Sequence, residues 1–106
     1  MEEPTVLVVE IHVPLVATAT AGYAYPWIDH VEELLFAGAE DGAYEVYDDG
    51  EELDDEYLFF VTGADEATLV AVAGTVARHP GVPDGVYARV ADDEADMGTG
   101  RRVEVA

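Results

Sequence analysis

The residues best suited to chemistry in this sequence are Glu10 and His12, which stand two positions apart in a run of β-branched and aliphatic residues. Side chains two positions apart in a β-strand point to the same face of the sheet. A carboxylate beside an imidazole can line a small polar pocket that binds an acid or a polar ligand. The other interpretation, which we favour, is that Glu10 forms a structural ion pair with Arg89 at the rim of a dimer interface.

Other kinds of catalytic or cofactor site are disfavoured by the residue types present. The chain contains no Ser and no Cys, so nucleophilic acyl transfer would have to use a Thr. Its three His have no spacing typical of zinc ligands. Gly63-Ala64-Asp65 puts a carboxylate where a phosphate-binding loop would hold an anion. We therefore expect no catalytic residue, no metal and no cofactor, and we favour a non-enzymatic protein.

An acidic stretch, Asp48 to Glu56, holds seven carboxylates in nine residues. A calcium loop needs oxygen ligands at alternate positions before its glycine. Aligning Gly50 with that glycine places Tyr47, a poor ligand, at one of those positions. The stretch is better interpreted as a solvated turn that protects a sheet edge. A second acidic cluster, Asp92 to Asp96, fails the calcium pattern in a similar way.

The charge balance bears on partners. The chain has 24 Asp and Glu, four Arg and no Lys, for a formal net charge of −20 on 106 residues. Such a chain repels phosphate backbones and anionic membranes, so we expect neither nucleic acid nor membrane as a partner. Adaptation to high salt and a base-composition bias against Lys both explain the missing Lys. Charge also makes a basic protein a candidate partner.

Length and composition indicate one globular domain spanning residues 1–106. Half of the residues are hydrophobic, which is too many for a disordered acidic chain. No apolar run approaches the ~20 residues of a membrane span. The acidic N-terminus does not resemble a signal peptide, and the lack of Cys excludes a disulfide framework. We expect a cytoplasmic protein.

Hydrophobic patterns predict a first strand over Thr5 to Val13 and another central strand over Glu56 to Thr62, each apolar on both faces. A helix is predicted from Pro26 to Gly38 or Gly42. The aromatic residues at its start, Tyr23, Tyr25 and Trp27, are interpreted mainly as a lid over the core.

The remaining elements are shorter. A strand over Ala43 to Tyr47 either continues to Leu53 through a bulge at Gly50 or stops at Asp48. A second helix is capped by Asp65 and ends before Pro80. Further strands are predicted over Gly85 to Ala91 and over Arg101 to Val105.

This order, β-α-β-β-α-β with a short fifth strand, predicts an α+β fold. Two right-handed split βαβ units give an antiparallel sheet with both helices on one face, the ferredoxin-like sandwich. The first and third strands should form its central pair.

The face that the helices leave open is the main candidate site. It should carry Val6, Val8, Glu10 and His12 from the first strand. The third strand adds either Tyr57, Phe59 and Val61 or else Leu58 and Phe60. Tyr87, Arg89, Arg102 and Glu104 complete it. An exposed patch of this mixed kind, several hundred Å² in area, usually marks an interface. Glu10 and Arg89 should face each other across neighbouring strands.

The segment from Tyr47 to Ala73 resembles a group of small uncharacterised bacterial proteins. Their shared pattern is an acidic Asp-Gly hairpin, an apolar strand, then Gly-x-Asp and a helix, and it is matched here by Asp49, Gly50, Gly63, Asp65 and Leu69. The resemblance implies the same fold and no function. The overall shape also resembles that of dimeric α+β barrel proteins, some of which are cofactor-independent monooxygenases, by analogy of fold alone.

These observations give a leading hypothesis and two alternatives. The leading hypothesis is a homodimer that forms through the open sheet face. One alternative is an acidic immunity or inhibitor protein that neutralises a basic target. The other is a small ligand-binding domain or cofactor-independent enzyme with a pocket around His12 and Glu10. Three of the four Arg fall on the last two strands, so one sheet edge should be locally positive.

Overall fold

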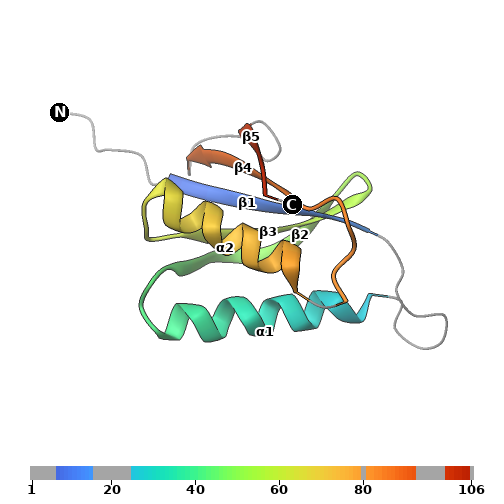
Figure 1. Ribbon diagram of the computed structural model, residues 1–106, viewed down its shortest axis with the longest axis horizontal. Coiled ribbons are helices and arrows are strands. Elements are labelled where there is room, and N and C mark those ends of the chain that lie inside the picture. The colour runs from blue at the N-terminus through green and yellow to red at the C-terminus, as the bar shows by residue number, and fades with distance from the viewer. Residues whose placement is uncertain (1–6, 16–24, 80, 93–99, 106) are drawn as a thin grey trace.

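Five strands form one antiparallel sheet in the order β2-β3-β1-β4-β5, and both helices lie on one side of it (Figure 1). The computed structural model describes residues 7–15, 25–79, 81–92 and 100–105. The elements are β1 (Leu7–Pro14), α1 (Pro26–Glu40), β2 (Glu45–Leu53), β3 (Glu56–Thr62), α2 (Glu66–Arg78), β4 (Tyr87–Asp92) and β5 (Arg101–Glu104). The predicted α+β class with an antiparallel sheet and two helices is therefore confirmed.

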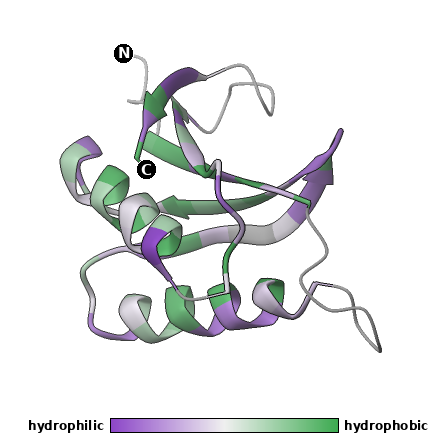
Figure 2. Cartoon of the chain, turned by 45° about the vertical axis from the view of Figure 1, so that its right-hand side comes forward, coloured by the Kyte–Doolittle hydropathy of each residue, from purple (hydrophilic) through white to green (hydrophobic). Residues whose placement is uncertain are grey.

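The two most apolar strands occupy the middle of the sheet, with β1 between β3 and β4. The side chains of Val9, Ile11 and Val13 are fully buried on the face beneath the helices. Figure 2 shows the result: apolar residues follow the central strands, and hydrophilic residues gather at the hairpin that joins β2 to β3. The strands that read as apolar on both faces are central because both of their faces are buried.

The first helix buries one stripe against the sheet. Pro26 occupies its first turn, where the missing N–H costs nothing. Trp27, Val31 and Leu35 recur every four residues and are all buried. The helix ends at Glu40, and Gly42 follows with a φ of +84°, within the predicted range for its end.

The second helix depends on its cap and its packing. The Asp65 side chain accepts a hydrogen bond from the Thr68 N–H at 2.8 Å, and the hydrogen bonds with Thr68 lower the pKa of Asp65. Several β-branched residues and Gly74 give the helix low intrinsic propensity. Leu69 and Ala73 are fully buried in the core that α2 shares with the sheet, so packing holds the helix in place.

The edge strand β2 is bulged. Its register against β3 shifts between Val46 and Asp48 and again between Asp48 and Glu51. A Cβ at Gly50 would lie 2.4 Å from Cε1 of Tyr57, so only glycine allows this close approach. The bulge predicted near Gly50 is confirmed, and the alternative of a strand that stops at Asp48 is wrong. The first shift was not predicted, because nothing in the residues around Tyr47 marks it.

Two strand boundaries differ slightly from the prediction. The fourth strand begins at Tyr87 rather than Gly85, because Gly85 has a φ of +97°, outside the β region. The last strand ends at Glu104 rather than Val105. None of the described helices is long and apolar enough to cross a lipid bilayer.

Candidate site on the open sheet face

Strand register arranges the open-face residues in two rows that run across the sheet. Directly paired residues of neighbouring antiparallel strands point to the same face. The first row runs from β3 to β5 through Phe60, Glu10, Arg89 and Arg102. The second row runs through Glu51, Leu58, His12, Tyr87 and Glu104. The structure thus brings together all five residues singled out from the sequence: Glu10, His12, Tyr87, Arg89 and Arg102. It also selects Leu58 and Phe60 as the third strand's contribution to this face.

His12 lies at the centre of the face and is only 1% exposed. Its Nε2 is 3.0 Å from Oε1 of Glu10, and its Nδ1 is 3.3 Å from Oε1 of Glu56. The Glu10 side chain is 5% exposed and that of Glu56 is 26% exposed. The imidazole therefore joins an inner carboxylate on its own strand to an outer carboxylate on β3.

Each ring nitrogen of His12 thus lies within hydrogen-bond distance of a glutamate side chain. The imidazole has no ring nitrogen left over for a further partner.

Tyr87 covers the imidazole on the β4 side. The two rings stack with centroids 4.7 Å apart and an interplanar angle of 18°. The Tyr87 hydroxyl donates a 2.8 Å hydrogen bond to Oε1 of Glu56, the same oxygen that faces His12. Burial raises the pKa of Tyr87, and the hydrogen bond to Glu56 and the charge of that carboxylate raise it further. Tyr87 and His12 thereby share one acceptor.

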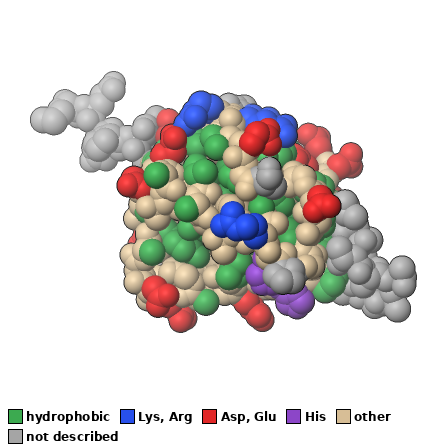
Figure 3. Space-filling view, viewed as in Figure 1, with side chains coloured by type: hydrophobic (Ala, Val, Ile, Leu, Met, Phe, Trp, Pro, Cys, Tyr) green, Lys and Arg blue, Asp and Glu red, His purple; other side chains and the backbone are tan. Residues whose placement is uncertain are grey.

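Two arginines lie on the outer side of Tyr87. The Arg102 guanidinium carbon is 3.9 Å from the Tyr87 ring centroid, and that of Arg89 is 5.6 Å away, both within cation–π range. Arg89 donates to the Gly100 carbonyl at 2.8 Å, and Arg102 donates to Glu104 at 2.8 Å. Figure 3 shows arginine side chains gathered at the end of the molecule where Figure 1 places β4 and β5.

We call Tyr87, Arg89 and Arg102 the arginine strip. Arg89 and Arg102 are directly paired across β4 and β5, and like charges in that position repel each other. Glu10 is the partner of Arg89 on the opposite side, as the sequence predicts. The strip is therefore a place where an additional carboxylate is electrostatically favoured.

The apolar residues expected in an exposed, mixed patch on this face are buried. Val8 is 4% exposed, Leu58 is fully buried, and Phe60 is 9% exposed. These three form a small second core with Leu53 packed against it. Long side chains explain part of the difference, because Tyr87 and Glu56 lie across the central strands and are not extended into solvent. The exposed residues of this face lie at its margin, on the edge strands β2 and β5.

Glu56 is the site residue that sequence reasoning missed. It was assigned only to the acidic hairpin, yet its side chain reaches both His12 and Tyr87. Its position at the start of β3, paired with Pro14 at the end of β1, could have indicated a place on the same face. Strand parity alone left two choices for the third strand, so this signal was not decisive.

The other residues singled out from the sequence are packed in the structure, exposed on its surface or outside the described residues. The Tyr25 and Trp27 rings pack edge to face with centroids 6.2 Å apart, and Trp27 is buried. Tyr23, Val6 and most of the second acidic cluster lie outside the described residues. His30 is exposed on α1. Within residues 7–15, 25–79, 81–92 and 100–105, no group of three His, Asp or Glu is placed to hold a metal ion.

Comparison with known proteins adds no relative: no protein-family model, curated protein or solved structure matches this chain.

Proposed function

We propose that the chain is a non-enzymatic domain of the ferredoxin-like class that associates with a second copy of itself through the margin of its open sheet face. The strand order, with β2-β3-β1-β4 at its core and both helices on one side, supports the class. The short β5 extends the sheet beyond β4. We include a cytoplasmic location in this proposal, as expected for an acidic chain without Cys.

The observation that carries the proposal is the direct pairing of Arg89 with Arg102 at one side of the open face. The opposite side carries the exposed carboxylate of Glu51 in the row of His12. A two-fold axis parallel to the strands would place the β5 side of one copy over the β2 side of the other. Because this axis keeps each row opposite itself, Arg102 would lie over the β2 edge of the other copy, one row away from Glu51, and the contact would be self-complementary.

The state of His12 supports a non-enzymatic role. Both of its ring nitrogens are engaged by carboxylates and the ring is covered by Tyr87. A general base needs a nitrogen that reaches a substrate proton. In this arrangement the imidazole instead ties β1 to β3 and β4, which keeps the arginine strip in a fixed position.

The test is the oligomeric state of the wild-type chain and of two matched charge reversals. Arg102→Glu places a carboxylate in the arginine strip. Arg78→Glu makes the same charge change at an exposed position of α2, away from the open face. Sedimentation equilibrium should give a dimer for the wild type, a weaker dimer for Arg102→Glu and no change for Arg78→Glu. A monomeric wild type, or equal effects of the two reversals, would contradict the proposal.

A further inference from the structure

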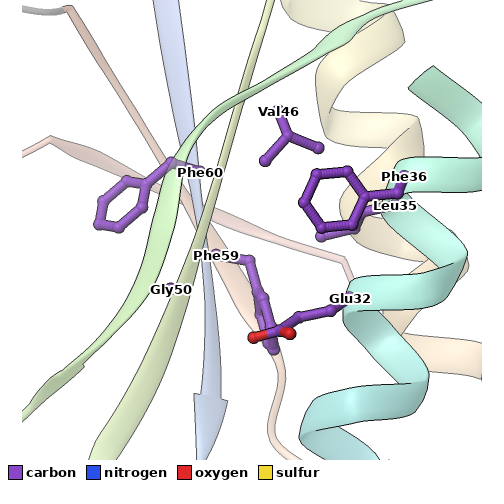
Figure 4. A pocket seen from close by; sticks show the side chains of 7 residues that line it. All are labelled: Glu32, Leu35, Phe36, Val46, Gly50, Phe59 and Phe60. Carbon is purple, nitrogen blue, oxygen red and sulfur yellow. The ribbon is translucent and has the colours of Figure 1, made fainter. Parts of the chain in front are cut away.

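A cleft opens between α1 and the bulged edge strand β2, on the side of the molecule opposite β5. Figure 4 shows Glu32, Leu35 and Phe36 projecting from α1 toward the strands. Val46 and Phe59 face them, and Phe60 points to the other side of the sheet. Gly50 completes the lining. The two register shifts in β2 displace its backbone here, which explains why the gap is not filled by the strand itself.

A large exposed apolar side chain lies at this cleft. Phe36 is 53% exposed and lines the cleft. A half-exposed aromatic ring beside an apolar cleft is typical of an interaction surface.

The size of the cleft limits what enters it. It holds only about 50 Å³, whereas small-molecule sites hold ~300–1,000 Å³. The occupant is therefore a side chain of a partner protein rather than a free ligand. Addition of a partner strand to β2 is also disfavoured, because bulges interrupt its hydrogen-bonding edge.

Charge identifies the kind of partner. Residues 26–62, which supply the whole cleft, contain 13 of the 24 Asp and Glu and no Lys or Arg. Glu33 precedes Phe36 by about one helical turn and Glu40 follows it by another, and both are exposed. An aliphatic side chain flanked by cations would match this surface.

We propose that the cleft lined by Leu35, Phe36 and Val46 binds a basic protein segment that inserts one apolar side chain between α1 and β2. A second copy of this chain fits less well here, because the proposed dimer uses its arginine strip on the open sheet face and its Arg101 is paired with Glu66. This surface is separate from the arginine strip, so the two proposals stand or fall independently.

The test uses a short synthetic peptide of Lys and Leu titrated into the isotope-labelled full chain. Two peptides of equal length serve as controls, one of Glu and Leu and one of Lys and Gly. Amide shifts should concentrate at Phe36, Val46 and Gly50 with the Lys–Leu peptide, and both control peptides should bind at least tenfold more weakly. Calorimetry gives the affinities.

Matched variants separate the cleft from general attraction to an acidic protein. Phe36→Ala should weaken binding of the Lys–Leu peptide tenfold or more, and thermal melting checks that the variant is folded. Glu33→Gln, about one helical turn from Phe36, should weaken it severalfold. Glu104→Gln makes the same charge change on the far edge and should leave it unchanged.

Four results of the peptide titrations would overturn the proposal. These are absence of binding, equal binding by Phe36→Ala, shifts spread evenly over the acidic surface, and equal binding of the Glu–Leu peptide. If unlabelled chain, added without any peptide, shifts the amide signal of Phe36, then a second copy occupies the cleft, and the proposal is also overturned. The dimer proposal is tested separately by Arg102→Glu, so failure of the cleft proposal leaves the dimer proposal intact, and the reverse also holds.

Discussion

Replacing His12 by leucine should destabilise the protein strongly, because the imidazole that contacts the carboxylates of Glu10 and Glu56 is lost. In the native structure the imidazole lies 3.0 Å from Glu10 and 3.3 Å from Glu56. The Glu10 side chain is 5% exposed, so water cannot replace the lost contact. Breaking a buried pair by removing one partner costs about 3–5 kcal/mol. We expect the free energy of unfolding of His12→Leu to fall by about that amount.

Urea unfolding followed by circular dichroism measures the effect, with His30→Leu as the matched control. His30 is exposed on α1, so its substitution should change the free energy of unfolding by no more than about 0.5 kcal/mol. The double variant Glu10→Leu/His12→Leu also removes the buried carboxylate and adds apolar surface beside Val8 and Leu58. It should recover most of the loss, since a buried ion pair replaced by apolar residues is often neutral or stabilising.

The reasoning fails if His12→Leu loses less than about 1 kcal/mol, or if the double variant is no more stable than the single one. Either result would mean that Glu10 does not depend on the imidazole.

Three further predictions concern packing, pH and salt. Gly38→Ala should lower the free energy of unfolding, measured in urea, by about 1–3 kcal/mol. The added Cβ would lie 2.3 Å from the Tyr44 hydroxyl, which donates a hydrogen bond to the Leu35 carbonyl. An unchanged free energy of unfolding would contradict this close packing. Tyr87 should titrate above the ordinary pKa of about 10 by ultraviolet absorbance, owing first to burial and then to Glu56. Since its pKa is raised in the folded state, its contribution to stability is complete below pH about 10 and is lost as pH rises through the folded value; a normal titration would refute this. Thermal stability should rise with KCl, because salt screens repulsion within a chain of net charge −20; a decrease would show that local ion pairs dominate.

Much of the architecture follows from hydrophobic pattern. Thr5 to Val13 and Glu56 to Thr62 are apolar on both faces, and burial of both faces requires a central place in the sheet. Pro26 and Asp65 mark the helix starts through the chemistry of the first turn. Glu10, His12, Tyr87, Arg89 and Arg102 could be assigned to one face because β-strand parity is strict once the strand order is fixed.

Other features depend on side-chain conformation, which the pattern does not encode. The role of Glu56 requires its side chain to lie over β1, and its sequence neighbours mark it only as part of a hairpin. Burial of Leu58 and Phe60 on the open face could not be predicted, because a face without helices was assumed to be exposed. The cleft beside Phe36 arises from two bulges in β2, of which only the one near Gly50 has a signal in the sequence.

The central claim, association through the arginine strip, is tested most directly by isotope-filtered NOE spectroscopy on a mixture of labelled and unlabelled chains. We predict intermolecular contacts that join the side chains of Tyr87 and Arg102 in one copy to that of Glu51 in the other. Absence of intermolecular contacts, or contacts confined to the cleft between α1 and β2, would contradict the claim.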